Sequence, residues 1–122
     1  MNPVAFYKCL ADDTRLRSLL LIAHEGELCV CELMEALSLS QPKISRHLAQ
    51  LRQCALLNDR RQGQWVFYSL NPSLPEWARQ VLETTLAENV TFISDNVQAL
   101  AQLQQRPARE ARCCPSRENN EQ

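Results

Sequence analysis

The sequence predicts a mainly α-helical fold with one β-hairpin, and three observations lead to that prediction. Apolar residues recur at helical spacing from Leu16 through the first half of the chain. They alternate with polar residues from Trp65 to Leu70, as in a half-buried strand. A second helical pattern runs from Pro75 to about Gln105. With 122 residues, 45% of them hydrophobic and 22% charged, the chain has the size and composition of a single globular domain.

Two helices are expected first. One covers Pro3 to Ala11. Asp12 and Asp13 are suited to cap the second, because a short carboxylate accepts hydrogen bonds from the first amides of a helix. The second helix ends at Gly26, a residue that favours helix C-termini. Its apolar face consists of Leu16, Leu19, Leu20 and Ala23.

The next two helices are short and close together. The pattern predicts one from Cys29 to Leu37 and another from Gln41 to about Gln53, joined by the turn Ser38 to Ser40. Ser40 can cap the later helix, and Pro42 is tolerated in its first turn. Two short helices joined by a three-residue turn indicate a helix-turn-helix.

A β-hairpin is expected after this pair. Arg61 to Gln64 forms the turn that precedes the strand Trp65 to Leu70. A hairpin in this position is a wing, so the predicted fold is a winged helix-turn-helix.

The last predicted helix, Pro75 to Gln105, carries an apolar stripe longer than a small core can cover. Its spacing is nearly heptad. We therefore expect a homodimer, dimeric through its terminal helices. Residues 1–105 form the domain, and residues 106–122 form a flexible tail that carries Cys113 and Cys114. The stripe consists of Leu82, Leu86, Val90, Ile93, Val97 and Leu100.

The helix Gln41 to Gln53 presents hydrogen-bonding side chains opposite its apolar face. Arg46 and Gln50 have the side chains that read guanine and adenine in the major groove. Residues 40–64 contain five cationic side chains and only one acidic side chain, that of Asp59. The local net charge is therefore +4, in a chain of net charge −1. Double-stranded DNA is the expected partner, although a merely solvated polar face is the alternative. The candidate DNA contacts are Gln41, Lys43, Ser45, Arg46, Gln50, Arg60 and Arg61.

The six cysteines are expected to be thiols, because the sequence shows neither a signal peptide nor a membrane span and we expect the protein to be cytoplasmic. Cys9 and Cys54 have apolar neighbours, which indicates core packing. Cys29 and Cys31 are two apart. Residues at i and i+2 diverge on a helix but share one side of an extended segment. The pair can therefore grip one soft ion only if the start of the helix distorts.

Two other interpretations of these thiols remain open. Cys29 and Cys31 could be small buried hydrophobes, as free cysteines often are. Alternatively, Cys29 with Cys31, or Cys113 with Cys114, could oxidise to a disulfide and act as a redox switch. An enzyme is not expected, since the sequence offers no Cys-x-x-Cys context, Ser/His/Asp set or Gly-rich phosphate loop.

Three segments together resemble the ArsR family of arsenic-responsive winged-helix repressors: Glu27 to Leu33, Ser40 to Leu48 and Arg61 to Val66. The resemblance covers roughly residues 4–100. It implies a homodimer that represses an arsenic-resistance operon and leaves its operator when As(III) or Sb(III) binds thiolates. It also implies that Cys29 and Cys31 bind the inducer, that Gln41, Ser45 and Arg46 contact the operator, and that no cofactor is required.

The sequence departs from the family pattern at Met34, where a third cysteine is often found. A thioether is a poorer ligand than a thiolate. The missing sulfur can come from Cys113 or Cys114 of either chain or from a small thiol in solution, and we expect it from the tail. Zinc sensing through ligands on the last helix is disfavoured, because no histidine follows His47. A cadmium- or lead-sensing repressor of the same fold remains an alternative.

Overall fold

The computed structural model describes residues 1–104. The predicted tail, with Cys113 and Cys114, lies outside the described residues. Within them, no helix has both the length and the apolar character needed to cross a bilayer. The elements follow in the order α1 (Pro3–Leu10), α2 (Asp13–Glu25), β1 (Leu28–Cys29), α3 (Val30–Leu37), α4 (Gln41–Gln53), β2 (Leu57–Gln62), β3 (Trp65–Leu70), α5 (Glu76–Glu88), the 3-10 helix η1 (Val90–Ile93) and α6 (Ser94–Gln104).

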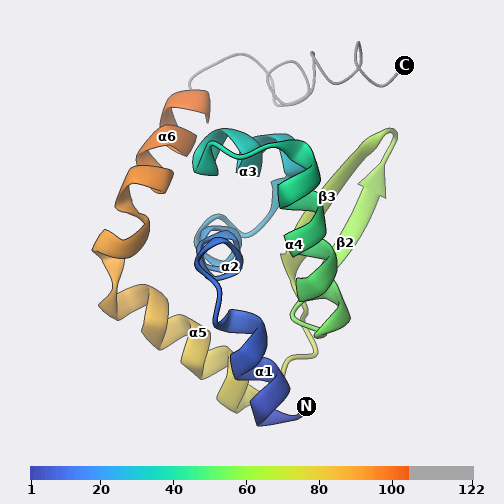
Figure 1. The fold of residues 1–122 in the computed structure, drawn as a ribbon, viewed down its shortest axis with the longest axis vertical. Coiled ribbons are helices and arrows are strands. Elements are labelled where there is room, and N and C mark those ends of the chain that lie inside the picture. The colour runs from blue at the N-terminus through green and yellow to red at the C-terminus, as the bar shows by residue number, and fades with distance from the viewer. Residues whose placement is uncertain (105–122) are drawn as a thin grey trace.

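Helix α2 is the centre of the core. It is seen nearly end-on in the middle of Figure 1, with the other helices around it. Residues 19–22 are fully buried, so α2 is covered on nearly every side. Its ends confirm the prediction. The Asp12 carboxylate accepts a hydrogen bond from the Arg15 amide, and Gly26 ends the helix at φ 93°.

Helices α3 and α4 form the predicted helix-turn-helix. Ser38 ends α3 in the left-handed conformation, at φ 57°. Ser40 takes the predicted cap position of α4, but its side chain makes no capping hydrogen bond. Ile44, Leu48 and Leu51 are fully buried, which confirms the inward face of α4.

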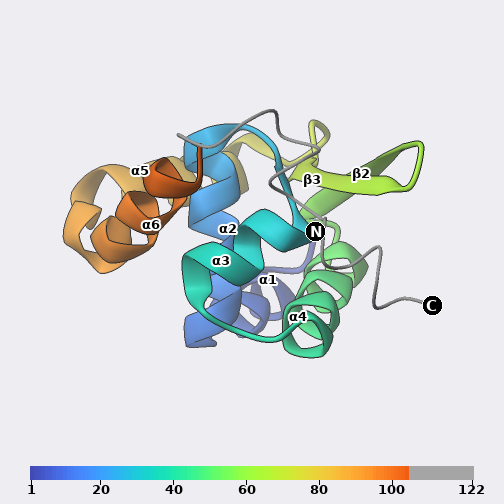
Figure 2. The same ribbon diagram turned by 90° about the horizontal axis from the view of Figure 1, so that it is seen from above.

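The predicted wing is present, and a third strand joins it. Strands β2 and β3 pair antiparallel around the two-residue loop Gly63-Gln64, where Gly63 has φ 64°. Figure 2 shows this hairpin projecting beside α4. Within residues 1–104 the sheet has the order β1-β3-β2. The prediction missed β1 and started α3 one residue too early.

The single long helix predicted from Pro75 to Gln105 is wrong. The chain breaks into α5, η1 and α6, and Figure 1 shows α6 turning back toward α3. Asn89 ends α5 at φ −133° and ψ 49°, and its side-chain amide donates to the Thr85 carbonyl. Arg17 of α2 holds the far side of the break by donating to the Phe92 carbonyl and to Asn96 Oδ1.

This break changes the meaning of the apolar stripe. Leu82, Ile93 and Leu100 are 2% exposed or less, so much of the stripe packs in the core of its own chain. The argument that the stripe outruns the core was therefore wrong. Val90 is still 65% exposed, and on α1 Val4 and Tyr7 are 62% and 52% exposed. Exposed apolar side chains are typical of interaction surfaces, so dimerisation through the terminal helices is still proposed.

Candidate nucleic-acid interface and thiol site

The outward face of α4 consists of polar side chains, as its periodicity predicts. Gln41, Lys43, Arg46 and Gln50 are exposed and Ser45 is half-buried. The apolar face of the helix is buried in the core, and this sets the orientation of the helix. The polar side chains on the opposite face therefore all point to the solvent. The helix can therefore present them together to a groove.

Ion pairs divide the cations of this region into two groups. Arg52 pairs with Asp59 at 2.9 Å, and Arg60 pairs with Glu27 at 2.7 Å. The Glu27 carboxylate raises the pKa of Arg60. Within residues 1–104, no ion pair forms to Lys43, Arg46 or Arg61. These three cations therefore have the charge most available to phosphates.

The side chain of Gln50 has a hydrogen-bond partner that the sequence does not predict. Arg15 of α2 donates from Nη1 to Gln50 Oε1 at 2.8 Å and from Nε to the Cys9 carbonyl at 2.7 Å. The side-chain amide of Gln50 is thus oriented by Arg15 of α2 in the absence of DNA. His47 is half-buried, with Nδ1 3.8 Å from Asp12 Oδ2.

Cys29 is the N-cap residue of α3 and belongs to β1. It is 2% exposed and extended, at φ −96° and ψ 170°. Its amide donates to the carboxylate of Glu32, 3.0 Å away, and Glu32 is itself fully buried. Cys31 is half-buried in the first turn of α3. Of the two cysteines only Cys31 therefore lies on a helix, so the i, i+2 restriction is weaker than the sequence predicts.

Cys29 and Cys31 belong to the same small cluster. Cys29 and Phe67 are its buried members, and Cys31 and Trp65 pack against them. Phe67 is the pairing partner of Cys29 between β1 and β3. The guanidinium of Arg60 lies 4.8 Å from the centre of the Phe67 ring. Both cysteines therefore lie at the base of the wing.

A pocket of about 160 Å³ joins this cluster to the start of α4. Cys29 lines it together with Gln41 and Ser45 of α4. Burial raises the pKa of Tyr68, so its phenol stays protonated at neutral pH. The arrangement brings a predicted inducer ligand and two predicted DNA contacts to one cavity. The lining residues are Cys29, Val30, Gln41, Ser45, Trp65, Val66 and Tyr68.

Other sulfur atoms lie in the core. Met34 is half-buried and packs against the main apolar cluster, as does Cys54, and Cys9 is 5% exposed. The core packing predicted for Cys9 and Cys54 is confirmed. Within residues 1–104, no three side chains of His, Cys, Asp or Glu come together in a way that could hold a metal ion. The third sulfur proposed from Cys113 or Cys114 lies outside these residues.

The sequence did not predict the contacts of three neighbours of the candidate sites: Arg15, Glu27 and Glu32. Arg15 and Glu27 reach partners 35 and 33 residues away, so no local pattern reveals them. Glu32 had a signal. A carboxylate three residues after an N-cap position is the spacing of a capping box, although Cys replaces the usual Ser or Thr.

Comparison with known proteins places these features among bacterial regulators. Residues 12–59 match the family model described as "Bacterial regulatory protein, arsR family". The arsenic resistance transcriptional regulator ArsR2 of Pseudomonas putida is 55% identical over 114 residues, which cover 93% of this chain and 99% of that protein. The arsenical resistance operon repressor of Escherichia coli K12 is 56% identical over 81 residues, 66% of this chain and 69% of the relative.

Solved structures agree with the fold. HlyU from Vibrio cholerae N16961 matches with a TM-score of 0.65 and 34% identity, over 72% of this chain and 91% of that one. The antimony-specific transcriptional repressor AntR matches with a TM-score of 0.59 and 32% identity, over 69% of this chain and 73% of that one.

Proposed function

Because the chain belongs to the ArsR family of bacterial regulatory proteins, we propose that it represses an arsenic-resistance operon by binding operator DNA. We further propose that As(III) or Sb(III), held by cysteine thiolates, releases it. The names of its relatives support the first part, since they are arsenic-resistance regulators and repressors. The geometry around Cys29 supports the second part.

Helix α4 is the proposed recognition helix. Arg46 forks onto a guanine edge, Gln41 and Ser45 lie at the end that enters the groove first, and Gln50 reads adenine from the orientation that Arg15 gives it. Lys43 and Arg61 neutralise phosphates from two sides. Arg60, which is paired with Glu27, is assigned to phosphate contact at the rim of the wing.

The observation that carries the proposal is the pocket that Cys29 shares with Gln41 and Ser45. Any movement of the Cys29 backbone changes a wall that the start of the recognition helix also forms. Cys31 packs against the cluster of Cys29 and Phe67, so both sulfurs are close to this wall. A soft trivalent ion prefers such thiolates to nitrogen or oxygen ligands.

The magnitudes allow release. Drawing the two sulfurs together disturbs the Cys29 amide bond to Glu32 and the pairing of β1 with β3, and each hydrogen bond lost costs about 0.5–1.5 kcal/mol. Thiolate sites can supply around 10 kcal/mol or more. A hundredfold loss of DNA affinity needs a coupling free energy of only about 2.8 kcal/mol. Inducer capture by cysteine thiolates can therefore supply the free energy needed for release.

A third sulfur completes the trigonal site in this proposal. Met34 packs in the core and its thioether carries no charge, so we assign the position to Cys113 or Cys114. The protein acts as a cytoplasmic homodimer. Its terminal helices provide the contact, supported by exposed Val4, Tyr7 and Val90. A shift to monomer in Tyr7→Glu, measured by analytical ultracentrifugation, tests that contact.

One titration series tests the function. The reduced protein is bound to DNA from upstream of its own coding sequence, and arsenite, antimonite, cadmium or zinc is added while fluorescence anisotropy reports release. Arsenite and antimonite are expected to release the wild type and the matched control Cys54→Ser, but not the double variant C29S/C31S. The double variant C113S/C114S is expected to need more arsenite.

The same series distinguishes the alternatives. Release by cadmium but not by arsenite identifies a cadmium or lead sensor of the same fold. Release by peroxide, with no response to arsenite under reduction, identifies a redox switch. If arsenite still detaches C29S/C31S, the thiol mechanism is wrong while the repressor assignment stands.

A further inference from the structure

Cys9 and Cys54 lie together where α1 meets the end of α4. The carbonyl of Gln50 accepts the backbone N–H of Cys54 at 3.1 Å. It also accepts the thiol of Cys9, with Sγ 3.7 Å from the oxygen. Two cysteines from different helices therefore converge on one acceptor. Neither belongs to the cluster of Cys29, Cys31, Phe67 and Trp65.

Both of these cysteines are free thiols. Burial, together with a hydrogen bond to the Cys54 side chain, raises the pKa of Cys9 to about 12. Cys9 therefore carries its proton at neutral pH and is a weak nucleophile toward ordinary alkylating reagents. A ligand suited to this pair has to accept thiol protons and not depend on preformed thiolates.

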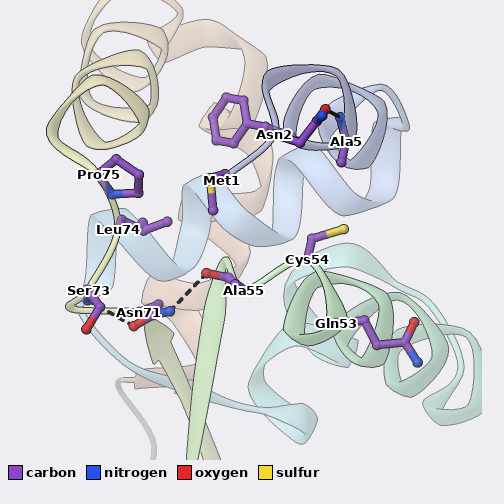
Figure 3. Close-up of a pocket in the computed structure, with 11 residues that line it drawn as sticks. Met1, Asn2, Ala5, Gln53, Cys54, Ala55, Asn71, Ser73, Leu74 and Pro75 are labelled. Atoms are coloured by element: carbon purple, nitrogen blue, oxygen red, sulfur yellow. Dashed lines mark hydrogen bonds between the residues drawn. The ribbon is translucent and has the colours of Figure 1, made fainter.

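A pocket gives access to one member of the pair. Cys54 lines a hollow of about 400 Å³ between α1, the end of α4 and the segment that leads into α5. Figure 3 shows Leu74 and Pro75 across this hollow from Cys54, with Met1 between them. A cavity of roughly 150 Å³ is enough for a benzene ring. An organic group of that size fits beside the Cys54 thiol.

We propose that Cys9 and Cys54 form a second arsenical site, which takes a monosubstituted trivalent arsenical whose apolar substituent enters the Met1–Leu74–Pro75 pocket. In R–As(OH)₂ two As–O bonds break and two As–S bonds form. The two thiol protons leave with the two hydroxides as water, and arsenic stays trivalent throughout. Cys54 reacts first from the pocket, and Cys9 then gives up its bond to Gln50.

The number of donors selects this ligand class. Two thiols satisfy both exchangeable positions of R–As(OH)₂, whereas inorganic arsenite, with three, keeps one hydroxide. Metal ions such as zinc prefer four ligands. Within residues 1–104, no cluster of three metal-binding side chains includes this pair. The site is independent of the proposed inducer site at Cys29 and Cys31.

The test uses phenylarsenoxide, which hydrates to this form in water. Serine at Cys29, Cys31, Cys113 and Cys114 leaves Cys9 and Cys54 as the only cysteines of the six. Native mass spectrometry is expected to show one phenylarsenic group per chain. Arsenic K-edge absorption is expected to show two sulfur neighbours. Adding Cys9→Ala or Cys54→Ala is expected to weaken binding by roughly a hundredfold or more, because the second bond is no longer intramolecular.

Equal affinity in the two-cysteine chain and in either single-cysteine chain overturns the proposal, and so does the absence of a stable adduct. Circular dichroism checks the fold of the four-serine chain. If it does not fold, the wild-type chain is compared with the single variant Cys9→Ala. One fewer bound phenylarsenic group in the variant supports the site, and an equal number in both overturns it. Arsenite release from DNA is expected to survive Cys9→Ala, so this result is separate from that of the proposed function.

Discussion

Cys29 lies directly opposite Phe67 in the antiparallel pairing of β1 with β3, so one proposed inducer ligand is part of the base of the wing. Trp65 packs against the same pair. The wing and the proposed inducer site therefore share one packed cluster. A movement of the sulfur atoms acts directly on the wing, because no other residues lie between them in this cluster.

Trp65 is expected to report inducer binding by its fluorescence, because its ring contacts the cluster that the thiols enter. Trp77→Phe removes the other tryptophan, which lies on α5 and packs against Phe6. Arsenite is expected to change the Trp65 emission in that variant. The same titration with Cys29 and Cys31 both changed to serine is expected to give no change. An unaltered response in the serine variant would disprove this link.

Glu32 is expected to stabilise the fold through the cap it gives Cys29. Glu32→Ala leaves the buried Cys29 amide without its acceptor and lowers the free energy of unfolding by about 1–3 kcal/mol. Glu32→Gln is the matched control, because its side-chain oxygen still accepts from that amide. Urea denaturation of the two variants measures the difference. Equal losses would show that charge, and not the cap, is the stabilising feature.

Local rules made much of this fold predictable. The Asp12 and Gly26 ends of α2, the buried stripe of α4 and the glycine loop of the wing each depend on residues close in sequence. The exposed polar face of α4 follows from the same periodicity.

The parts that were missed depend on distant partners. The strand β1 has two residues and exists because Tyr68 and Phe67 lie opposite Leu28 and Cys29. The break after α5 is held by Arg17, which is 75 residues before Phe92 in the chain. The near-heptad pattern continues across that break, so periodicity alone predicts one helix. The pairs Arg15–Gln50 and Glu27–Arg60 are likewise tertiary.

Arg17 is expected to hold the turn between α5 and α6. Its guanidinium donates to the Phe92 carbonyl and Asn96, and lies 4.1 Å from the centre of the Phe92 ring. Arg17→Met is expected to lower the free energy of unfolding by about 1–3 kcal/mol. The control is Arg79→Met, which loses one 3.3 Å bond to the Pro72 carbonyl and changes stability by less than about 0.5 kcal/mol. Similar losses in both variants would contradict this role.

Arg46 and Arg61 are expected to contribute differently to DNA binding. Arg46→Ala is expected to cost about 1–3 kcal/mol and to relax the preference for one base, because the proposed bidentate contact to guanine would be lost. Arg61→Ala weakens binding to all sequences and reduces the salt slope by about 1. Arg52→Ala is the control on α4, since Arg52 is paired with Asp59. Anisotropy titrations at several salt concentrations measure all three. Equal losses for Arg46→Ala and Arg52→Ala would refute the assignment.

Asp12 is expected to make stability depend on pH. The hydrogen bond from the Arg15 amide, helped by His47 and the Arg15 charge, lowers the pKa of Asp12 below 3.8 in the folded chain. The ionised carboxylate therefore favours folding. Its contribution is fully present above the unfolded pKa and is lost as the pH falls through the folded value.

Two substitutions separate the cap of α2 from this charge. Asp12→Ala removes both and is expected to cost about 0.5–2 kcal/mol at neutral pH. Asp12→Asn keeps an acceptor for the Arg15 amide and is expected to cost less. Because asparagine does not titrate, the difference in unfolding free energy between wild type and Asp12→Asn should be constant above about pH 5 and shrink below it. Urea denaturation across this range measures it, and a difference that grows in acid would reverse the sign of the linkage.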